Sequence, residues 1–144
     1  MIIEQNREAS LRDMFKLMEF MFIFVIPLLT MKIFSEDKRW GTMEFLLTCP
    51  IKNFQIVIGK FLGSYIFFLI LIFLTVFYYV IIEIFGTPDR LAIAAGYIGI
   101  LLEGALFIAI GILTSSWTRN QIVAAMFSYI IIFFLYFSVS FLKY

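Results

Sequence analysis

Few residues of this chain have the types and spacing that catalysis or metal binding requires. The 144-residue sequence has no histidine and a single cysteine, Cys49, which we interpret as a small apolar residue. Nucleophilic sites of the Ser/His/Asp or Cys/His kind, and metal sites with histidine ligands, are therefore excluded. Gly59-Lys60 is followed by Phe61 and lacks the upstream glycine of G-x-x-x-x-G-K-[ST], so no ATP-binding loop is visible. We expect no catalytic residue, no metal site and no bound cofactor.

One acidic residue, Glu103, lies far from the other charges. It interrupts the uncharged stretch from Leu91 to Thr118, at about 18 Å of helix from Leu91. An ionised carboxylate that faces lipid costs several kcal/mol. Glu103 is therefore either neutral or paired inside a helix bundle, or it lines a path for a substrate or ion. Its possible partners are Ser64, Tyr65, Ser128 and Tyr129.

The elements that must position these residues are long apolar helices. Hydrophobic residues make up 63% of the chain and charged residues 15%, which is outside the range of soluble domains. A hydrocarbon core of about 30 Å needs about 20 helical residues. The long stretches with few or no charges predict an all-α fold, a polytopic membrane helix bundle in one domain over 1–144. The expected transmembrane helices, about four, cover about 15–34, 54–85, 91–117 and 120–142.

Basic residues indicate the orientation of this bundle. Lysine and arginine are dense in the connection 32–60, whereas the later connections hold only Arg90 and Arg119. The positive-inside rule then favours a cytoplasmic location for 32–60. The N-terminal segment also contributes basic residues, so the totals on the two sides are nearly equal and the assignment depends on local density.

The segment 35–53 is expected to contain a short helix. Gly41 breaks the preceding helix, Thr42 is a good N-cap, and Glu44 falls in the first turn, where the helix dipole favours an anion. Pro50 prevents continuation past Cys49.

The predicted short helix has one apolar face, formed by Met43, Leu46 and Leu47. A helix of about seven residues is not stable alone. It must therefore pack either on the membrane surface, as an anchor, or on a cytoplasmic partner. After Pro50, Asn53 is expected to cap the next helix.

Several runs of residues resemble those of ABC type-2 export permeases, most closely the branch of gliding-motility-associated and copper-processing permeases. The runs are Pro27-Leu28-Leu29-Thr30-Met31, residues 36–50, Ile58-Gly59-Lys60-Phe61-Leu62 and residues 111–125. The resemblance implies that 35–53 holds a cytoplasmic coupling helix that seats in a groove on an ATPase subunit. The implied coupling residues are Glu36, Arg39, Gly41, Thr42, Met43, Glu44, Leu46, Leu47 and Pro50. Arg119 and Asn120 would lie in a second cytoplasmic turn.

The resemblance further implies that the chain is the permease subunit of an exporter, multi-pass in the cell (inner or plasma) membrane. It would not itself be an enzyme, because ATP and Mg would bind to a separate cytoplasmic ATPase. A second permease copy or a paralogue would complete a dimer, and no nucleic-acid partner is expected. Residues 35–60 and Arg119 would face the cytoplasm, and Thr87-Pro88 the exterior.

The number of helices departs from this family pattern. Family members usually have six membrane helices, whereas four are counted here, and residues 1–16 resemble the external loop after the family's first helix. The chain is therefore expected to lack the first and last helices, as a fragment or a truncated or split permease. Two alternatives remain: a secondary transporter or channel that uses Glu103, and a membrane scaffold that transports nothing.

Overall fold

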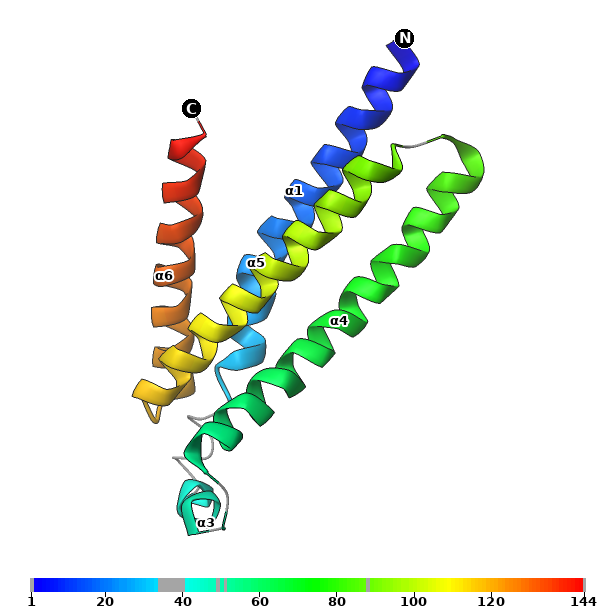
Figure 1. Cartoon of the computed structure of the whole chain (residues 1–144). Coiled ribbons are helices and arrows are strands. Elements are labelled where there is room, and N and C mark those ends of the chain that lie inside the picture. The colour runs from blue at the N-terminus through cyan, green and yellow to red at the C-terminus, as the bar shows by residue number, and fades with distance from the viewer. Residues whose placement is uncertain (1, 34–40, 49, 51, 88, 144) are drawn as a thin grey trace.

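The computed structural model describes residues 2–33, 41–48, 50, 52–87 and 89–143, which form helices joined by short connections (Figure 1). The helices are α1 (Ile2–Thr30), α3 (Thr42–Thr48), α4 (Asn53–Phe85), α5 (Arg90–Trp117) and α6 (Gln121–Leu142). No strand occurs among the described residues. The prediction of an all-α fold is confirmed.

Three of the described helices, α4, α5 and α6, are long and apolar enough to cross a membrane. The 22 residues of α6 extend about 33 Å, which is close to the thickness of the hydrocarbon core. The 33 residues of α4 extend about 50 Å, so this helix must tilt or project beyond the core. The fourth long helix, α1, carries Lys16 and Glu19 near its middle and packs along α5. Together they form the predicted helical membrane bundle.

The N-terminal helix differs from its prediction. α1 begins at Ile2, well before the expected start near residue 15, and ends at Thr30 rather than near residue 34. The chain has no glycine or proline between Ile2 and Pro27, so no residue there breaks the helix. The expectation that residues 1–16 form a loop is therefore wrong, because they are helical from Ile2 onward.

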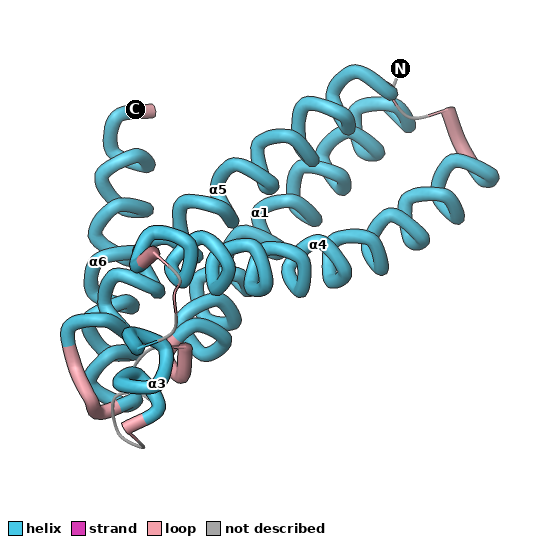
Figure 2. Tube along the Cα trace, turned by 60° about the horizontal axis from the view of Figure 1, so that its bottom comes forward, coloured by secondary structure: helices cyan, strands magenta, loops and turns pink. Residues whose placement is uncertain are grey.

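Helix α5 lies at the centre of the bundle. It contacts α1, α4 and α6, and α6 also contacts α1. Both termini and the α4–α5 connection lie at one end of the bundle, whereas α3 and the α5–α6 connection lie at the opposite end (Figure 1; Figure 2 shows a second view). α3 and Arg119 thus lie at one end of the bundle and Thr87 lies at the other end, as the predicted topology requires.

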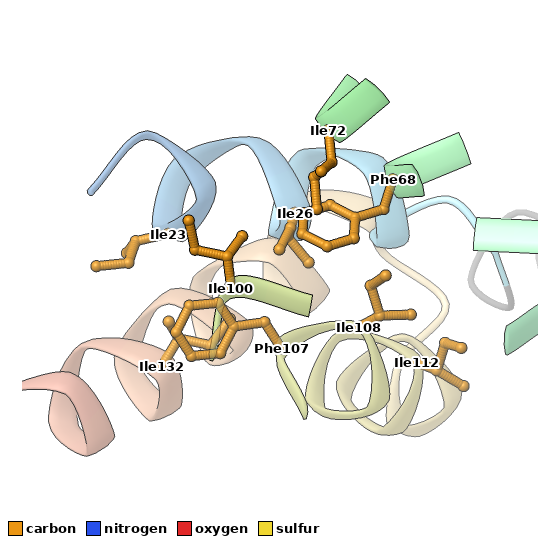
Figure 3. Packing of buried hydrophobic residues seen from close by; sticks show 9 residues of the cluster. All are labelled: Ile23, Ile26, Phe68, Ile72, Ile100, Phe107, Ile108, Ile112 and Ile132. Atoms are coloured by element: carbon orange, nitrogen blue, oxygen red, sulfur yellow. The ribbon is translucent and has the colours of Figure 1, made fainter. Parts of the chain in front are cut away.

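The hydrophobic core lies where the four long helices meet. Its buried residues are Ile23 and Ile26 of α1, Phe68 and Ile72 of α4, Ile100, Phe107, Ile108 and Ile112 of α5, and Ile132 of α6 (Figure 3). The rings of Phe22 and Phe68, with centroids 4.9 Å apart, join α1 to α4. Most other large apolar side chains of α4 and α6 face outward, where a bilayer would cover them.

Glycines allow other helices to approach α5 closely. A Cβ atom placed on any of three glycines of α5 would collide with a side chain of α1 or α4. These pairs are Gly96 with Phe15, Gly104 with Phe68, and Gly111 with Thr30. These three glycines of α5 thus serve helix packing.

Other glycines have open surroundings. A Cβ atom at Gly99, or at Gly59 or Gly63 of α4, would meet nothing within 4 Å. Gly59 and Gly63, although four residues apart on α4, therefore do not mark a close helix contact within the described part of this chain. The reason is that α4 turns a different face, which carries Phe68 and Ile72, toward α5.

Short polar contacts fix where α4 and α5 begin. Asp89 caps α5, because its Oδ1 accepts a hydrogen bond of 3.1 Å from the Leu91 amide. The prediction that Asn53 caps α4 is wrong by one residue, since Asn53 is already helical and Lys52 precedes the helix. The Lys52 amide donates to Oε1 of Gln55 at 3.2 Å, which supports the earlier start.

Candidate functional site

The short helix predicted after Gly41 is present as α3, and its backbone shows how the sequence sets its ends. Gly41 has a φ of +72°, a left-handed conformation that glycine adopts without strain, and α3 follows at once. The Glu44 amide donates to the Gly41 carbonyl at 3.3 Å, and Glu44 lies in the first turn as predicted. At the other end, Thr48 Oγ1 donates to the Phe45 carbonyl at 3.0 Å, and the helix ends before Pro50.

The side chains of α3 that are described point away from the bundle. Phe45 is 79% exposed and Leu47 is 55% exposed, and Glu44 and Thr48 are exposed beside them. Phe54, in the first turn of α4, is 73% exposed. Large apolar side chains at such exposure indicate a surface that another body covers. Sequence reasoning missed Phe45, because it does not belong to the predicted apolar face of the short helix.

Several predicted coupling residues lie outside what the structure describes. Glu36 and Arg39 are outside the described residues altogether. Thr42, Met43 and Leu46 are described only as part of the α3 backbone, which places Thr42 as the first helical residue rather than the cap before it. The helical backbone of α3 therefore agrees with the prediction, whereas its apolar face stays a prediction.

The turn predicted at Arg119 and Asn120 joins α5 to α6 and lies at the same end of the bundle as α3 (Figure 1). Arg119 is exposed. Asn120 caps α6, because its Oδ1 accepts from the Ile122 amide at 3.1 Å. Thr118 Oγ1 accepts from the Asn120 amide at 2.9 Å, which closes the turn. The segment that contains α3 and the α5–α6 turn thus lie at the same end of the bundle.

Glu103 lies on α5, half-buried, on the helix face that also carries Ile100 and Phe107. No hydrogen bond or ion pair of its carboxyl group occurs among the described residues. The four predicted partners make other contacts or none. Tyr65 Oη donates to the Leu101 carbonyl, Tyr129 Oη to the Phe24 carbonyl and Ser64 Oγ to the Lys60 carbonyl, while Ser128 Oγ is buried without a partner in the described chain.

The charges that act on Glu103 come from two other helices. Glu19 of α1 and Lys143, just after α6, interact with it electrostatically, and Tyr136 of α6 lies within range of both glutamates. Two carboxylates in a medium of low dielectric repel each other strongly. Glu19 falls near the start of the predicted helix 15–34, and sequence reasoning did not relate it to Glu103. No group of three or more His, Cys, Asp or Glu side chains that would hold a metal ion gathers in the described ranges.

Comparison with protein families gives a match along nearly the whole chain. Residues 2–144 match the family described as ABC-2 family transporter protein. This chain belongs to the ABC-2 transporter family. The comparisons with curated proteins and with solved structures gave no match. The predicted family is thus confirmed, whereas the gliding-motility and copper-processing branch stays a prediction.

As an ABC-2 family member, the chain is a permease component of an ABC transporter and a multi-pass membrane protein. The family's proteins are the transmembrane components of these transporters and are not themselves catalytic. The resemblance that rested on residues 27–31 and 36–50 is consistent with this match, which also covers α1 from its first residue.

The ABC-2 permease has further polar contacts that sequence reasoning did not find. Lys60, Ser115 and Tyr129 come from α4, α5 and α6, and each donates a hydrogen bond to a main-chain carbonyl near the C-terminal end of α1. Lys60 and Ser115 lie within the runs that resemble the family, and Tyr129 had been considered only as a partner of Glu103. No periodicity in the sequence indicates which carbonyl a side chain will meet.

Proposed function

We propose that this permease is the membrane subunit of an ATP-driven exporter and that a separate cytoplasmic ATPase acts on it through α3. The observation that carries the proposal is the exposure of Phe45 and Leu47 on a seven-residue helix outside the bundle. Membership of the ABC-2 family supports it, because such permeases work with an ATPase. ATP and Mg would bind to that partner.

The energetics of α3 favour a covering partner. Burial of a large apolar side chain contributes about 1.5–3 kcal/mol, while ordering one residue of backbone costs about 1–2 kcal/mol. A helix of seven residues whose apolar groups remain in water is therefore marginal at best. A groove that receives Phe45 and Leu47 would stabilise it, and Glu44, exposed in the first turn, would be available to a cation on the partner.

The proposal also covers the membrane in which the subunit lies and the second permease subunit that it needs. The density of basic residues in 32–60 supports a cytoplasmic location for α3, and hence the inner or plasma membrane. A second copy of this chain or a paralogue would complete the transporter, since ABC-2 permeases usually work in pairs. The placement of α3 and the α5–α6 turn at one end of the bundle (Figure 1) gives the ATPase two connections to contact from the same side.

Co-purification tests the proposal directly. Each ABC ATPase subunit of the source cell that lacks its own membrane domain is co-expressed with the tagged chain, and the complex is recovered from detergent. We expect one ATPase to co-purify with the unmodified chain, and the Phe45→Asp/Leu47→Asp variant to lose it while still inserting into the membrane. Phe85→Asp is the matched control, because Phe85 is also 79% exposed but lies at the opposite end of α4. Equal recovery with all three chains would contradict the proposal.

A second role is favoured by one observation, the half-buried Glu103 on the face of α5 that carries the core residues Ile100 and Phe107. An ionisable group at this depth suits a polar position along a substrate or ion path. Under the packing interpretation, Glu103→Gln leaves both assembly and transport-linked ATP hydrolysis unchanged. Loss of substrate-stimulated ATP hydrolysis in an intact complex would instead assign Glu103 to the path.

A further inference from the structure

The main chain from Phe24 of α1 to Ile33, just after α1, accepts one side-chain hydrogen bond from each of the other long helices. Tyr129 Oη of α6 donates to the Phe24 carbonyl at 2.9 Å. Ser115 Oγ of α5 donates to the Met31 carbonyl at 3.2 Å, and Lys60 Nζ of α4 donates to the Ile33 carbonyl at 2.8 Å. Three helices therefore hold one stretch of main chain between residues 24 and 33.

The helix is interrupted and ends within the same stretch. Pro27 lies inside α1 and has no N–H, so the Ile23 carbonyl lacks its usual helical donor. α1 ends at Thr30, and the chain continues as a turn in which the Ile33 amide donates to the Thr30 carbonyl at 3.1 Å. Thr30 Oγ1 also donates to the Ile26 carbonyl at 2.9 Å. The bonds from α4, α5 and α6 therefore meet the main chain around a proline and a helix end.

Packing holds the same stretch in place. Thr30 is completely buried, and its side chain occupies the space that a Cβ atom at Gly111 of α5 would need. Ser115 lies one turn further along α5 and is also completely buried. The backbones of α1 and α5 therefore approach closely next to the hydrogen bond between Ser115 and Met31, which leaves little room for α1 to slide.

The position of this stretch in the chain gives it a mechanical role. α1 leads directly into the segment that carries α3, and α4 begins after that segment. The bond from Lys60 to Ile33 joins the chain before α3 to the chain after it. With this bond in place, a force on α3 would act on α1 and α4 together, whereas a free proline-containing helix would bend at Pro27 and absorb it.

We propose that Lys60, Ser115 and Tyr129 are positioning residues that convey the movement of α3 to α4, α5 and α6 as one body. The proposal rests on the proposed action of an ATPase at α3 and adds the route by which that action reaches the bundle. The route consists of hydrogen bonds and close packing, which are among the contacts that can carry coupling between distant sites. None of the three residues needs to contact ATP, the ATPase or the substrate.

The test measures movement at the end of the bundle opposite to α3. Spin labels are attached to cysteines at Thr87 and Leu142, both exposed at that end, in a Cys49→Ser background. The complex with the co-purifying ATPase is placed in lipid nanodiscs, and the distance between the labels is measured without nucleotide and with ATP and vanadate. We expect the distance to change with nucleotide in the unmodified complex.

The variants remove each donor with little change of size. Lys60→Met, Ser115→Ala and Tyr129→Phe, singly and together, are expected to retain the ATPase but to lose most of the nucleotide-dependent change. Ser115→Thr keeps the hydroxyl group and Lys60→Arg keeps a donor, so both are expected to restore the change. The single variants keep the test decisive if the triple variant fails to fold.

Matched controls change the same groups elsewhere. They are Lys32→Met and Tyr78→Phe, whose side chains are exposed, and Ser138→Ala, whose hydroxyl donates within α6 to the Phe134 carbonyl. These are expected to behave as the unmodified chain. Full nucleotide-dependent change in all the donor variants, with the ATPase bound, would overturn this proposal alone. A wild-type complex that binds the ATPase but shows no change would overturn it as well, whereas failure to bind any ATPase would refute the proposed function.

Discussion

Gly111→Ala is expected to destabilise the bundle, because α1 leaves no space for a methyl group there. A Cβ atom at Gly111 would lie 2.7 Å from Cβ and 3.1 Å from Cγ2 of Thr30, with Oγ1 closer still. Thr30 is fully buried and bonded to the Ile26 carbonyl, so its side chain has no alternative position that keeps this bond. α1 must therefore shift away from α5, and the hydrogen bond from Ser115 to Met31 must stretch.

The size of the effect follows from overpacking of a core position, which costs about 1–3 kcal/mol. For a chain of this length that corresponds to a fall of about 3–10 °C in the midpoint of thermal unfolding. Gly99→Ala is the matched control, since it lies on the same helix and a Cβ atom there meets nothing within 4 Å. The comparison also cancels the gain in helix propensity, about 1 kcal/mol, that both substitutions share.

Thermal unfolding in detergent, followed by size-exclusion chromatography of a fluorescent fusion, measures the midpoint. The double variant Gly111→Ala/Thr30→Gly should be more stable than the sum of the single changes, because the second substitution removes the colliding atoms. Equal midpoints for Gly111→Ala and Gly99→Ala would refute the close contact between α1 and α5 at Thr30 and Gly111. They would also remove the packing that supports the proposed role of Ser115 in conveying movement from α3.

Three further predictions use simpler measurements. Cysteines introduced at Thr87 and at Arg119 in a Cys49→Ser background should react with an impermeant maleimide from opposite sides of the membrane, Arg119 from the cytoplasmic side; reversed labelling would contradict the orientation. Glu103→Gln should leave the unfolding midpoint at neutral pH unchanged or raised, because it removes the cost of holding an ionisable carboxyl group half-buried in the bundle, and a marked fall would show a stabilising partner of the carboxylate. Asn120→Ala should cost about 0.5–2 kcal/mol by loss of the α6 cap, whereas Asn120→Asp should cost little; equal midpoints for the two variants would contradict the capping role.

The boundaries of three helices could be predicted from the sequence because charge and helix breakers mark them. α4, α5 and α6 begin and end within one residue of the predicted limits, since Pro50, the Asp89 cap and the Asn120 cap interrupt the apolar runs. The extent of α3 was predicted for the same reason, because Gly41 and Pro50 enclose it. The start of α1 was not, because no residue before Pro27 marks a boundary and a polar helical stretch resembles a polar loop.

The contacts between helices could be predicted only in part. Glycines of α5 can receive neighbouring side chains because they are small, but which glycines do so depends on the direction in which each helix faces. Gly99 and Gly63 are open for this reason. The sequence offered four possible partners of Glu103 without choosing among them, and in the structure Tyr65 and Tyr129 donate to carbonyls of neighbouring helices instead. Such bonds depend on tertiary approach, and the sequence carries no spacing that marks them.

Photo-cross-linking at α3 tests the central claim most directly. A photoreactive phenylalanine analogue is placed at position 45, or at position 85 as the control of equal exposure, in the chain co-expressed with the ATPase. If α3 is the element on which the ATPase acts, the analogue at position 45 yields a covalent product with the ATPase, and the analogue at position 85 yields none. An ATPase that co-purifies with the chain but cross-links to neither position, while the analogue at position 45 reacts with lipid, would contradict the account and make α3 an anchor on the membrane surface.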